Sequence, residues 1–218
     1  RDVILKNRYY DMWAMDENFN LLWKHHGNIG HFPLAYDING DGRDEVMAGY
    51  DLLSADGEIM WSCQDLEDHA DCLWAGDVNG DGKPELCVGG SVTCLYDGEG
   101  KELWRYDGSI ESQHVALGKF LPDAPGLQVA GLDRIVRGDG YKGQWNGRDG
   151  MFLLDCGGRE VWKEDRKTPG WLTIVNTYRN WNGEGKDYIL AYRRGGGVKP
   201  TLYNGKMEEV VIFPEDGY

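Results

Sequence analysis

Two short loops in this chain concentrate oxygen-bearing side chains at a regular spacing. The first reads Asp37-Ile-Asn39-Gly-Asp41-Gly-Arg43-Asp-Glu45, and the second reads Asp77-Val-Asn79-Gly-Asp81-Gly-Lys83-Pro-Glu85. Calcium takes about six to eight hard oxygen ligands in a flexible geometry, and alternate residues of a tight loop can aim their oxygens inward. We predict one calcium ion in each loop, held by the side chains of Asp37, Asn39, Asp41 and Glu45 with the Arg43 carbonyl, and by those of Asp77, Asn79, Asp81 and Glu85 with the Lys83 carbonyl.

These loops begin like an EF-hand but end differently. An EF-hand places a bidentate Glu at its twelfth position, where this chain has Ala48 and Val88. Glu45 and Glu85 stand instead at the ninth position and lead into strand-like runs, as in the shorter calcium loops of propeller repeats. The alternative is an Asx-rich turn without metal, and the recurrence of the full pattern in register favours calcium. Such calcium usually stabilises a turn, whereas a catalytic role requires a ligand position open to substrate.

Three histidines precede loop positions in successive repeats, namely His31, His69 and His114. Imidazole titrates near neutral pH, so a set of histidines can take a proton from a sugar acid or line a binding groove. If their positions are equivalent, the repeat carries all three to one face, near a calcium loop or the 133–150 segment. We therefore name them as candidate catalytic residues. The alternative is a structural histidine that hydrogen-bonds a neighbouring repeat.

The segment 133–150 looks like an insertion into the repeat, and it is rich in Gly, basic and aromatic residues. Long loops on repeat scaffolds often build the binding face. Aromatic rings present apolar faces on which sugars stack, and Arg pairs with carboxylates. We predict substrate contacts from Arg134, Tyr141 and Trp145, against the alternative of a solvated loop.

A recurring hairpin pattern supplies the elements that position these residues. Strand-like runs flank a turn and close on Trp in residues 16–23, 56–61, 97–104 and 155–162, and more loosely in 204–213. Asp-Gly and Asn-Gly between alternating apolar residues favour hairpins. The two oxygen-rich loops begin 40 residues apart, and a four-stranded propeller blade takes roughly 40–50 residues. We predict an all-β propeller over residues 1–218, with four blades and part of a fifth, in which Trp23, Trp61, Trp104 and Trp162 are largely buried at equivalent positions.

Two further loops keep only traces of the calcium pattern. Residues 118–129 place Lys119 where the second loop has Asp77. Residues 180–188 keep Asn180, Asn182 and Glu184 but end in Tyr188. The pattern leaves open whether these two loops bind metal.

The composition excludes several classes of function. A formal net charge of −14 over 218 residues disfavours nucleic acid as a partner, because nucleic-acid binding needs a basic footprint. No apolar run approaches the length that spans a bilayer. Five cysteines include no C-x-x-C pair, which disfavours zinc, and an odd number leaves at least one thiol free. We expect a soluble bacterial protein, and the sequence leaves open whether it is secreted or cytoplasmic.

The run NIGHFPLAYDINGDGRDE, from Asn28 to Glu45, resembles the rhamnogalacturonan lyases of polysaccharide lyase family eleven. The triplet His69-Ala-Asp71 before the second loop and the segment 122–127, PDAPGL, are similar to the same family. The resemblance implies an eight-bladed propeller that binds calcium and cleaves rhamnogalacturonan, a pectin component, by β-elimination. This chain is too short for eight blades, so the remainder of a larger propeller or a second copy would have to close the ring.

β-Elimination from a uronic acid removes the proton at C5 and expels the oxygen at C4. A base takes the proton, and a cation on the carboxylate stabilises the developing enolate. Bound calcium also lets an acidic protein hold an acidic polysaccharide, because the ion inverts the local charge. The leading hypothesis is therefore calcium-assisted degradation of rhamnogalacturonan. The alternative is a non-catalytic calcium-binding propeller that binds glycan or protein.

Overall fold

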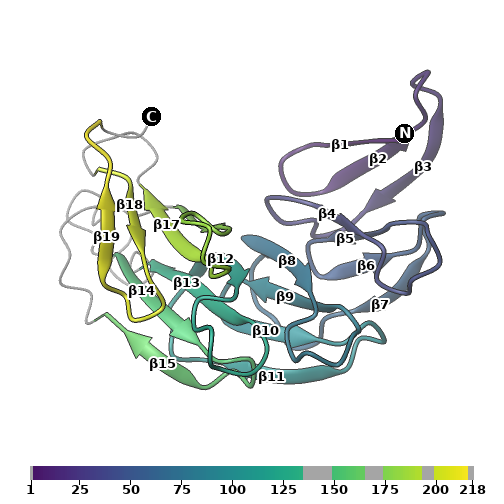
Figure 1. Cartoon of the computed structure of the whole chain (residues 1–218). Coiled ribbons are helices and arrows are strands. Elements are labelled where there is room, and N and C mark those ends of the chain that lie inside the picture. Colours follow the sequence, from purple (N-terminus) through teal and green to yellow (C-terminus); the bar gives the residue numbers. More distant parts are fainter. Residues whose placement is uncertain (1, 135–148, 165–173, 193–198, 216–218) are drawn as a thin grey trace, which may run out of the picture.

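The computed structural model describes residues 2–134, 149–164, 174–192 and 199–215, and every regular element within them is a β-strand. The strands form five antiparallel sheets, one of three strands and four of four strands, each built from consecutive strands. In Figure 1 the sheets follow one another in an open arc. The predicted all-β propeller with four blades and part of a fifth is confirmed. In the described ranges, no helix is long and apolar enough to cross a membrane.

The strand bounds follow the same meander in each sheet. The first sheet holds β1 (Val3–Lys6), β2 (Asp11–Met15) and β3 (Leu21–His26), and the second holds β4 (Leu34–Tyr36), β5 (Glu45–Ala48), β6 (Asp51–Leu53) and β7 (Ile59–Ser62). The third holds β8 (Cys72–Gly76), β9 (Glu85–Gly89), β10 (Thr93–Tyr96) and β11 (Glu102–Tyr106). The fourth holds β12 (Ser112–Gly118), β13 (Gln128–Arg134), β14 (Asp149–Leu154) and β15 (Glu160–Lys163), and the fifth holds β16 (Ile174–Tyr178), β17 (Tyr188–Tyr192), β18 (Thr201–Tyr203) and β19 (Glu209–Ile212).

The last two strands of every sheet are joined by the same five-residue turn, at 16–20, 54–58, 97–101, 155–159 and 204–208. A side-chain oxygen of its first residue accepts two main-chain N–H groups. In the third sheet, Asp97 Oδ1 accepts from Glu99 at 3.0 Å and from Lys101 at 2.9 Å. The fourth turn residue has a positive φ, which Gly adopts without strain, as Gly100 does at 85°. The hairpins predicted from the repeat are therefore present.

A tryptophan on the last strand of one sheet covers this turn in the next sheet. The Trp61 indole lies over Gly100, and its Nε1 donates to the Gly98 carbonyl at 3.0 Å. Trp23 makes the same contacts with the turn of the second sheet, and Trp104 makes them with the turn of the fourth sheet. Trp162 instead packs with other apolar residues against the core between the fourth and fifth sheets.

The four tryptophans occupy equivalent positions in strand pairing, as predicted. None of the four is exposed, and each packs against one of the core clusters, which agrees with the prediction that they are largely buried. Each stands on the last strand of its sheet, and these strands line the outer edge of the arc in Figure 1. The indole therefore covers a neighbouring turn without being enclosed on all sides.

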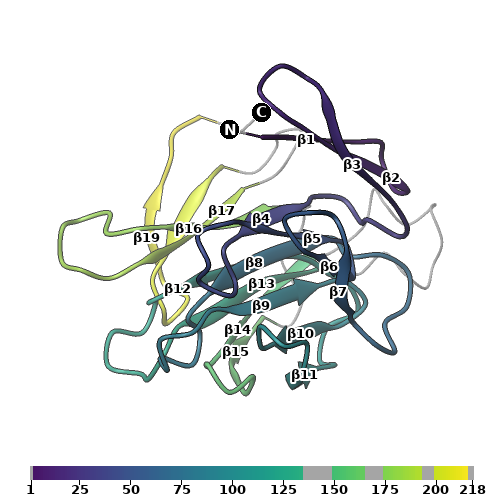
Figure 2. The same ribbon diagram turned by 90° about the vertical axis from the view of Figure 1, so that its right-hand side faces the viewer.

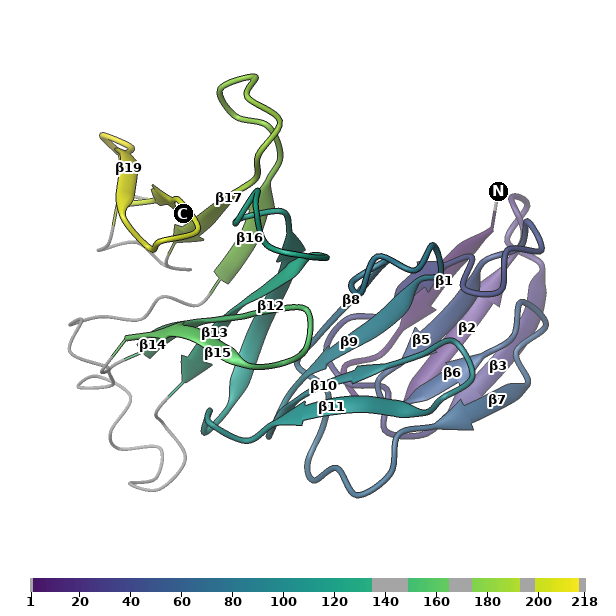
Figure 3. The same cartoon turned by 60° about the horizontal axis from the view of Figure 1, so that its bottom comes forward.

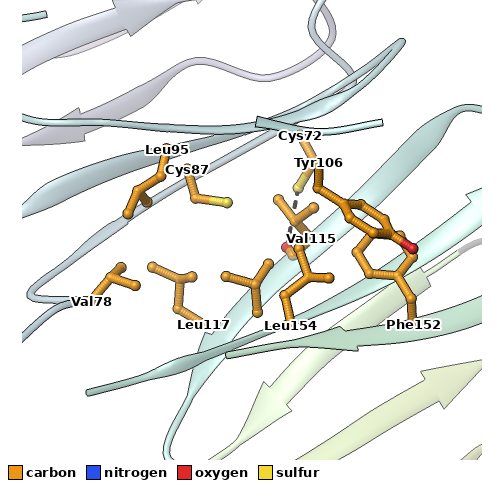
Figure 4. Packing of buried hydrophobic residues seen from close by; sticks show 10 residues of the cluster. Cys72, Val78, Cys87, Leu95, Tyr106, Val115, Leu117, Phe152 and Leu154 are labelled. Atoms are coloured by element: carbon orange, nitrogen blue, oxygen red, sulfur yellow. Dashed lines mark hydrogen bonds between the residues drawn. The ribbon is translucent and has the colours of Figure 1, made fainter. Parts of the chain in front are cut away.

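The core is divided into layers between neighbouring sheets. One buried cluster lies between the first and second sheets, and another lies between the second and third. Figure 3 shows these three sheets side by side. Figure 4 shows the layer between the third and fourth sheets, where Leu95 and Cys87 face Val115, Leu117 and Leu154. The last layer joins the fourth sheet to the fifth. Figure 1 shows the first and fifth sheets at the two ends of this stack, and in Figure 2 the first sheet lies at the upper right and the fifth at the left.

Candidate functional site

The second oxygen-rich loop connects β8 to β9. Asp77 Oδ1 accepts the main-chain N–H of Gly80 at 2.8 Å, and Asp77 Oδ2 accepts that of Gly82 at 3.0 Å. Asn79 Oδ1 and Asp81 Oδ1 each accept the N–H two residues later, at 2.7 Å and 2.8 Å. The two glycines have φ values of 84° and 88°, which explains why this tight loop needs them. Alternate side chains therefore turn their oxygens toward the inside of one loop.

Glu85 closes this loop from beneath. It is 2% exposed, and its Oε2 accepts the Val78 N–H at 2.7 Å while its Oε1 accepts from Asn79 Nδ2 at 2.7 Å. One carboxylate oxygen from each of Asp77, Asp81 and Glu85 lies within 4.8 Å of the others. Burial raises the pKa of Glu85, and repulsion from the other two carboxylates adds to the rise. This all-oxygen donor set fits calcium, because a cation would relieve both effects.

The first loop, between β4 and β5, repeats these hydrogen bonds. Asp37 accepts the N–H groups of the loop's two glycines, at 2.7 Å and 2.9 Å. Glu45 is 2% exposed, and it accepts from the Ile38 N–H and from Asn39 Nδ2, both at 3.0 Å. Within the described part of the chain, the close carboxylate grouping of the second loop has no counterpart here. The Arg43 guanidinium binds Asp56 at 2.6 Å. The calcium-ligand roles of the Arg43 and Lys83 main-chain carbonyls remain predictions.

In the β12–β13 loop an ammonium group binds the loop carbonyls. Lys119 Nζ donates to the carbonyls of Ala124 and Gly126, the latter at 2.9 Å. Gln128 takes the pairing position that Glu85 holds in the third sheet, and its Oε1 accepts the Leu121 N–H at 2.8 Å. A cation attached to the chain thus lies within this loop, and we expect no calcium there.

The β16–β17 loop keeps the turn but has Asn180 and Tyr188 in place of the first and last carboxylates. Asn180 Oδ1 accepts the Gly185 N–H at 2.7 Å, as Asp77 accepts from Gly82. Glu184 pairs with Lys186 at 2.6 Å, at the exposed surface. The register puts the buried ring of Tyr188 where the second loop has its buried glutamate. This loop lacks the buried carboxylate that closes the two complete loops.

His31, His69 and Asp71 come together just before β4 and β8, at the end of these strands opposite to the oxygen-rich loops. We call this group the histidine rim. The two Nε2 atoms lie 3.1 Å apart, and each lies 3.5 Å from Asp71 Oδ1. Asp71 is 2% exposed, whereas the histidines are partly exposed. Ligand atoms about 2.1 Å from a shared cation stand roughly 3–3.5 Å from one another. The group therefore has the dimensions of a metal site.

Hydrogen bonds orient the histidine rim. His69 Nδ1 lies 2.7 Å from Asp68 Oδ1, which favours the tautomer with its proton on Nδ1 and directs the Nε2 lone pair toward the rim. Asp68 adopts φ of 60°, a left-handed conformation that Asp tolerates better than most residues. The His31 N–H donates to the Ala70 carbonyl at 3.0 Å, which ties the two connecting segments together.

The complete loops and the histidine rim lie at opposite ends of the sheets. The five residues of β8 separate Asp71 from Asp77, and a strand of that length spans roughly 17 Å. Of the two expected positions, near a calcium loop or near the 133–150 segment, the histidines therefore do not take the first. The rim end is instead shared with the last residue of β13, Arg134, which pairs with Asp149 of β14. The 133–150 segment is thus anchored at the same end as the histidines.

His114 is not equivalent to the other two histidines. In the second, third and fourth sheets, the last residue of the first strand pairs across the loop with the first residue of the second strand. His31 and Asp71 each lie five residues before that last residue of the first strand. His69 stands seven residues back and His114 four, on β12. The expected equivalence of the three histidines is therefore wrong, and the close group includes His31 and His69 but not His114.

The remaining predicted residues belong to the insertion. Arg134 is placed by the main chain at the end of β13. Tyr141 and Trp145 lie outside the described residues. The substrate contacts of these three residues remain predictions.

Two residues of the rim, Tyr9 and Asp71, were not among the predicted site residues. The Tyr9 ring packs against both imidazoles, with centroids 5.4 Å from His31 and 5.2 Å from His69. The signal for Asp71 was its place two residues after His69. Tyr9 comes from the β1–β2 connection of the first sheet, which has no oxygen-rich loop to mark it.

No protein-family model matches the chain, and no curated protein sequence matches it. Solved structures share the fold. The exotype rhamnogalacturonan lyase YesX has a TM-score of 0.71 at 19% identity, over 98% of this chain and 37% of that one. The V. cholerae biofilm matrix protein Bap1 has a TM-score of 0.65 at 14% identity, over 93% and 58%. BamB from Moraxella catarrhalis has a TM-score of 0.62 at 15% identity, over 99% and 59%.

The chain thus spans between 37% and 59% of the length of these three proteins. At such identities the likeness shows the fold alone. The chain shares the propeller fold of rhamnogalacturonan lyases, and it shares that fold with two proteins that are not described as lyases.

Proposed function

We propose that this chain is the calcium-binding stretch of a lyase that cleaves rhamnogalacturonan, or a related pectic polysaccharide, by β-elimination. The observation that carries the proposal is the histidine rim, where two imidazoles and a buried carboxylate converge at 3.1–3.5 Å. The fold shared with a rhamnogalacturonan lyase supports the choice of substrate.

The rim residues have the chemistry that the reaction needs. The Asp68 contact leaves the Nε2 lone pair of His69 able to accept a proton, and His69 is partly exposed to a substrate. The buried carboxylate of Asp71 lies beside both imidazoles and stabilises their positive charge after proton uptake. A divalent cation held by His31, His69 and Asp71 would instead supply Lewis-acid stabilisation of a uronate carboxylate.

The two uses of these nitrogens exclude each other, because a lone pair on a metal cannot take a proton. In the base role, activity survives chelation under conditions where the fold is kept. In the cation role, chelation abolishes activity and added cation restores it. His114, Arg134, Tyr141 and Trp145 remain proposed groove residues in either case.

Calcium in the two complete loops has a structural role in this proposal. Asp37, Asn39, Asp41 and Glu45 hold one ion, and Asp77, Asn79, Asp81 and Glu85 hold the other. Both sites lie at the far end of the strands from the histidine rim, so these ions stabilise the sheets without touching the same sugar.

Site-directed variants test the proposal in the intact protein that carries this chain. His69→Ala and His31→Ala should each lower release of unsaturated uronide from rhamnogalacturonan by at least about a hundredfold, the lower range for loss of an acid–base group. Arg159→Ala is the control, because Arg159 is 87% exposed and lies in the β14–β15 turn, away from the histidine rim. Full activity in both rim variants would refute the proposal.

A non-catalytic calcium propeller that binds glycan or protein is the second candidate. The observation in its favour is that the biofilm matrix protein Bap1 matches the chain at a TM-score of 0.65, against 0.71 for the lyase YesX. Binding of rhamnogalacturonan without any unsaturated product, in the intact calcium-loaded protein, would select this candidate.

A further inference from the structure

A hollow of about 420 Å³ adjoins the histidine rim. It is lined by Tyr9, Tyr10, Asn28, Asp68 and His69. Tyr10 is 60% exposed, so its ring faces solvent at the edge of this hollow. The Tyr9 and Tyr10 ring centroids lie 6.2 Å apart with the planes at 67°, and together they form two walls of different orientation.

The connection that carries these rings, residues 7–10, is held rigidly. Asn7 Oδ1 accepts the N–H groups of Tyr9 at 3.1 Å and Tyr10 at 2.8 Å. The Tyr10 and Tyr9 carbonyls accept from the N–H groups of Gly27 and Ile29, both at 2.9 Å. An aromatic platform fixed in this way loses little conformational entropy when a ligand binds.

Positive charge is built into the same connection. Lys6 Nζ donates to the carbonyls of Arg8 at 2.7 Å and His31 at 3.1 Å, which links the connection to the rim. The exposed Arg8 guanidinium lies over the Tyr9 ring, 5.2 Å from its centroid. Stacked in this way, Arg8 presents a cation beside an apolar ring face.

We propose that the 7–10 connection and the hollow beside it form a saccharide subsite next to the histidine rim. Tyr10 stacks on a neutral sugar of the polymer, and Arg8 pairs with the carboxylate of a neighbouring uronic acid. The matching ligand alternates a neutral deoxysugar, whose apolar face suits a phenol ring, with a uronate. The identity of this polymer rests on the proposed function, whereas the aromatic platform and its cation do not.

Calorimetric titration of the calcium-loaded chain with saturated rhamnogalacturonan oligosaccharides tests the subsite. Tyr10→Ala should raise the Kd about tenfold, and Tyr10→Phe should change it less than about twofold, because an aromatic contact is the interaction removed. Tyr178→Ala is the matched control, since Tyr178 is 41% exposed and lies at the loop end of β16. An unchanged Kd for Tyr10→Ala, or an equal rise for the control, would overturn the inference.

A second measurement does not depend on any variant folding. Nitration of the exposed Tyr10 in the native chain should be slowed severalfold by the oligosaccharides and unaffected by a neutral galactan fragment. Equal nitration rates with and without the oligosaccharides count against the subsite.

The subsite and the lyase activity can fail separately. A protein that binds the oligosaccharides through Tyr10 but releases no unsaturated product keeps the subsite and removes the lyase assignment. An active lyase whose KM and kcat are unchanged by Tyr10→Ala keeps the assignment and removes the subsite.

Discussion

Replacing Gly100 by Ala tests the contact that repeats between sheets. Gly100 has φ of 85°, and an added Cβ would stand 2.6 Å from the Trp61 ring. A side chain in the left-handed region costs about 1–2 kcal/mol, and overpacking a fitted contact costs about 1–3 kcal/mol more. We expect Gly100→Ala to lower the free energy of unfolding by about 2–5 kcal/mol, as the sum of these two terms.

Gly183→Ala separates the two terms. Gly183 has φ of 77°, and a Cβ there would meet no atom within 4 Å. It should therefore cost only the backbone term of about 1–2 kcal/mol. Urea unfolding of both variants, at constant calcium and with equal m-values, measures the difference. Equal losses of stability in the two variants would refute the claim that tryptophans pack on the turns of neighbouring sheets.

Three further outcomes follow from the loops and the core. Asp77→Asn should remove one of two calcium ions counted by titration of the chelator-treated chain and lower the calcium-induced rise in Tm; an unchanged count would contradict the site. Lys119→Met should lower Tm without altering the calcium count, and a gained ion or an unchanged Tm would contradict the role of its ammonium. Burial raises the pKa of Cys72 to about 11 and of Cys94 to about 12. The stability gained by burying these neutral thiols is therefore complete below the ordinary thiol pKa of 9.0 and lost as pH rises toward 11–12. The urea midpoint should begin to fall above pH 9, and a midpoint that stays flat to pH 11 would contradict the burial of these thiols.

Much of the fold could be predicted because its signals are local. The five-residue turns depend on a side-chain oxygen at the first position and a left-handed residue at the fourth, and both are visible in sequence. The turns with Phe19 and Met207 show the limit of this reading. Both residues take φ values near 60° where the other sheets have Gly, so the conformation is kept without its usual residue.

The oxygen-rich loops were predictable for the same reason, since their ligands come from nine consecutive residues. The histidine rim depends on the alignment of two different sheets. His31 is equivalent to Asp71 in the repeat and not to His69, and only the packing of the two sheets shows that the three side chains meet. Tyr9 contacts the rim from the first sheet, and no repeat pattern in the sequence marks it.

The most direct test of the account is the ultraviolet absorbance of rhamnogalacturonan incubated with the intact, calcium-loaded protein that carries this chain. We predict a steady rise from the carbon–carbon double bond that β-elimination leaves at the new uronide end. New reducing ends without that absorbance would mean hydrolysis, and neither signal would mean no cleavage. Either of these results would contradict the proposed lyase function.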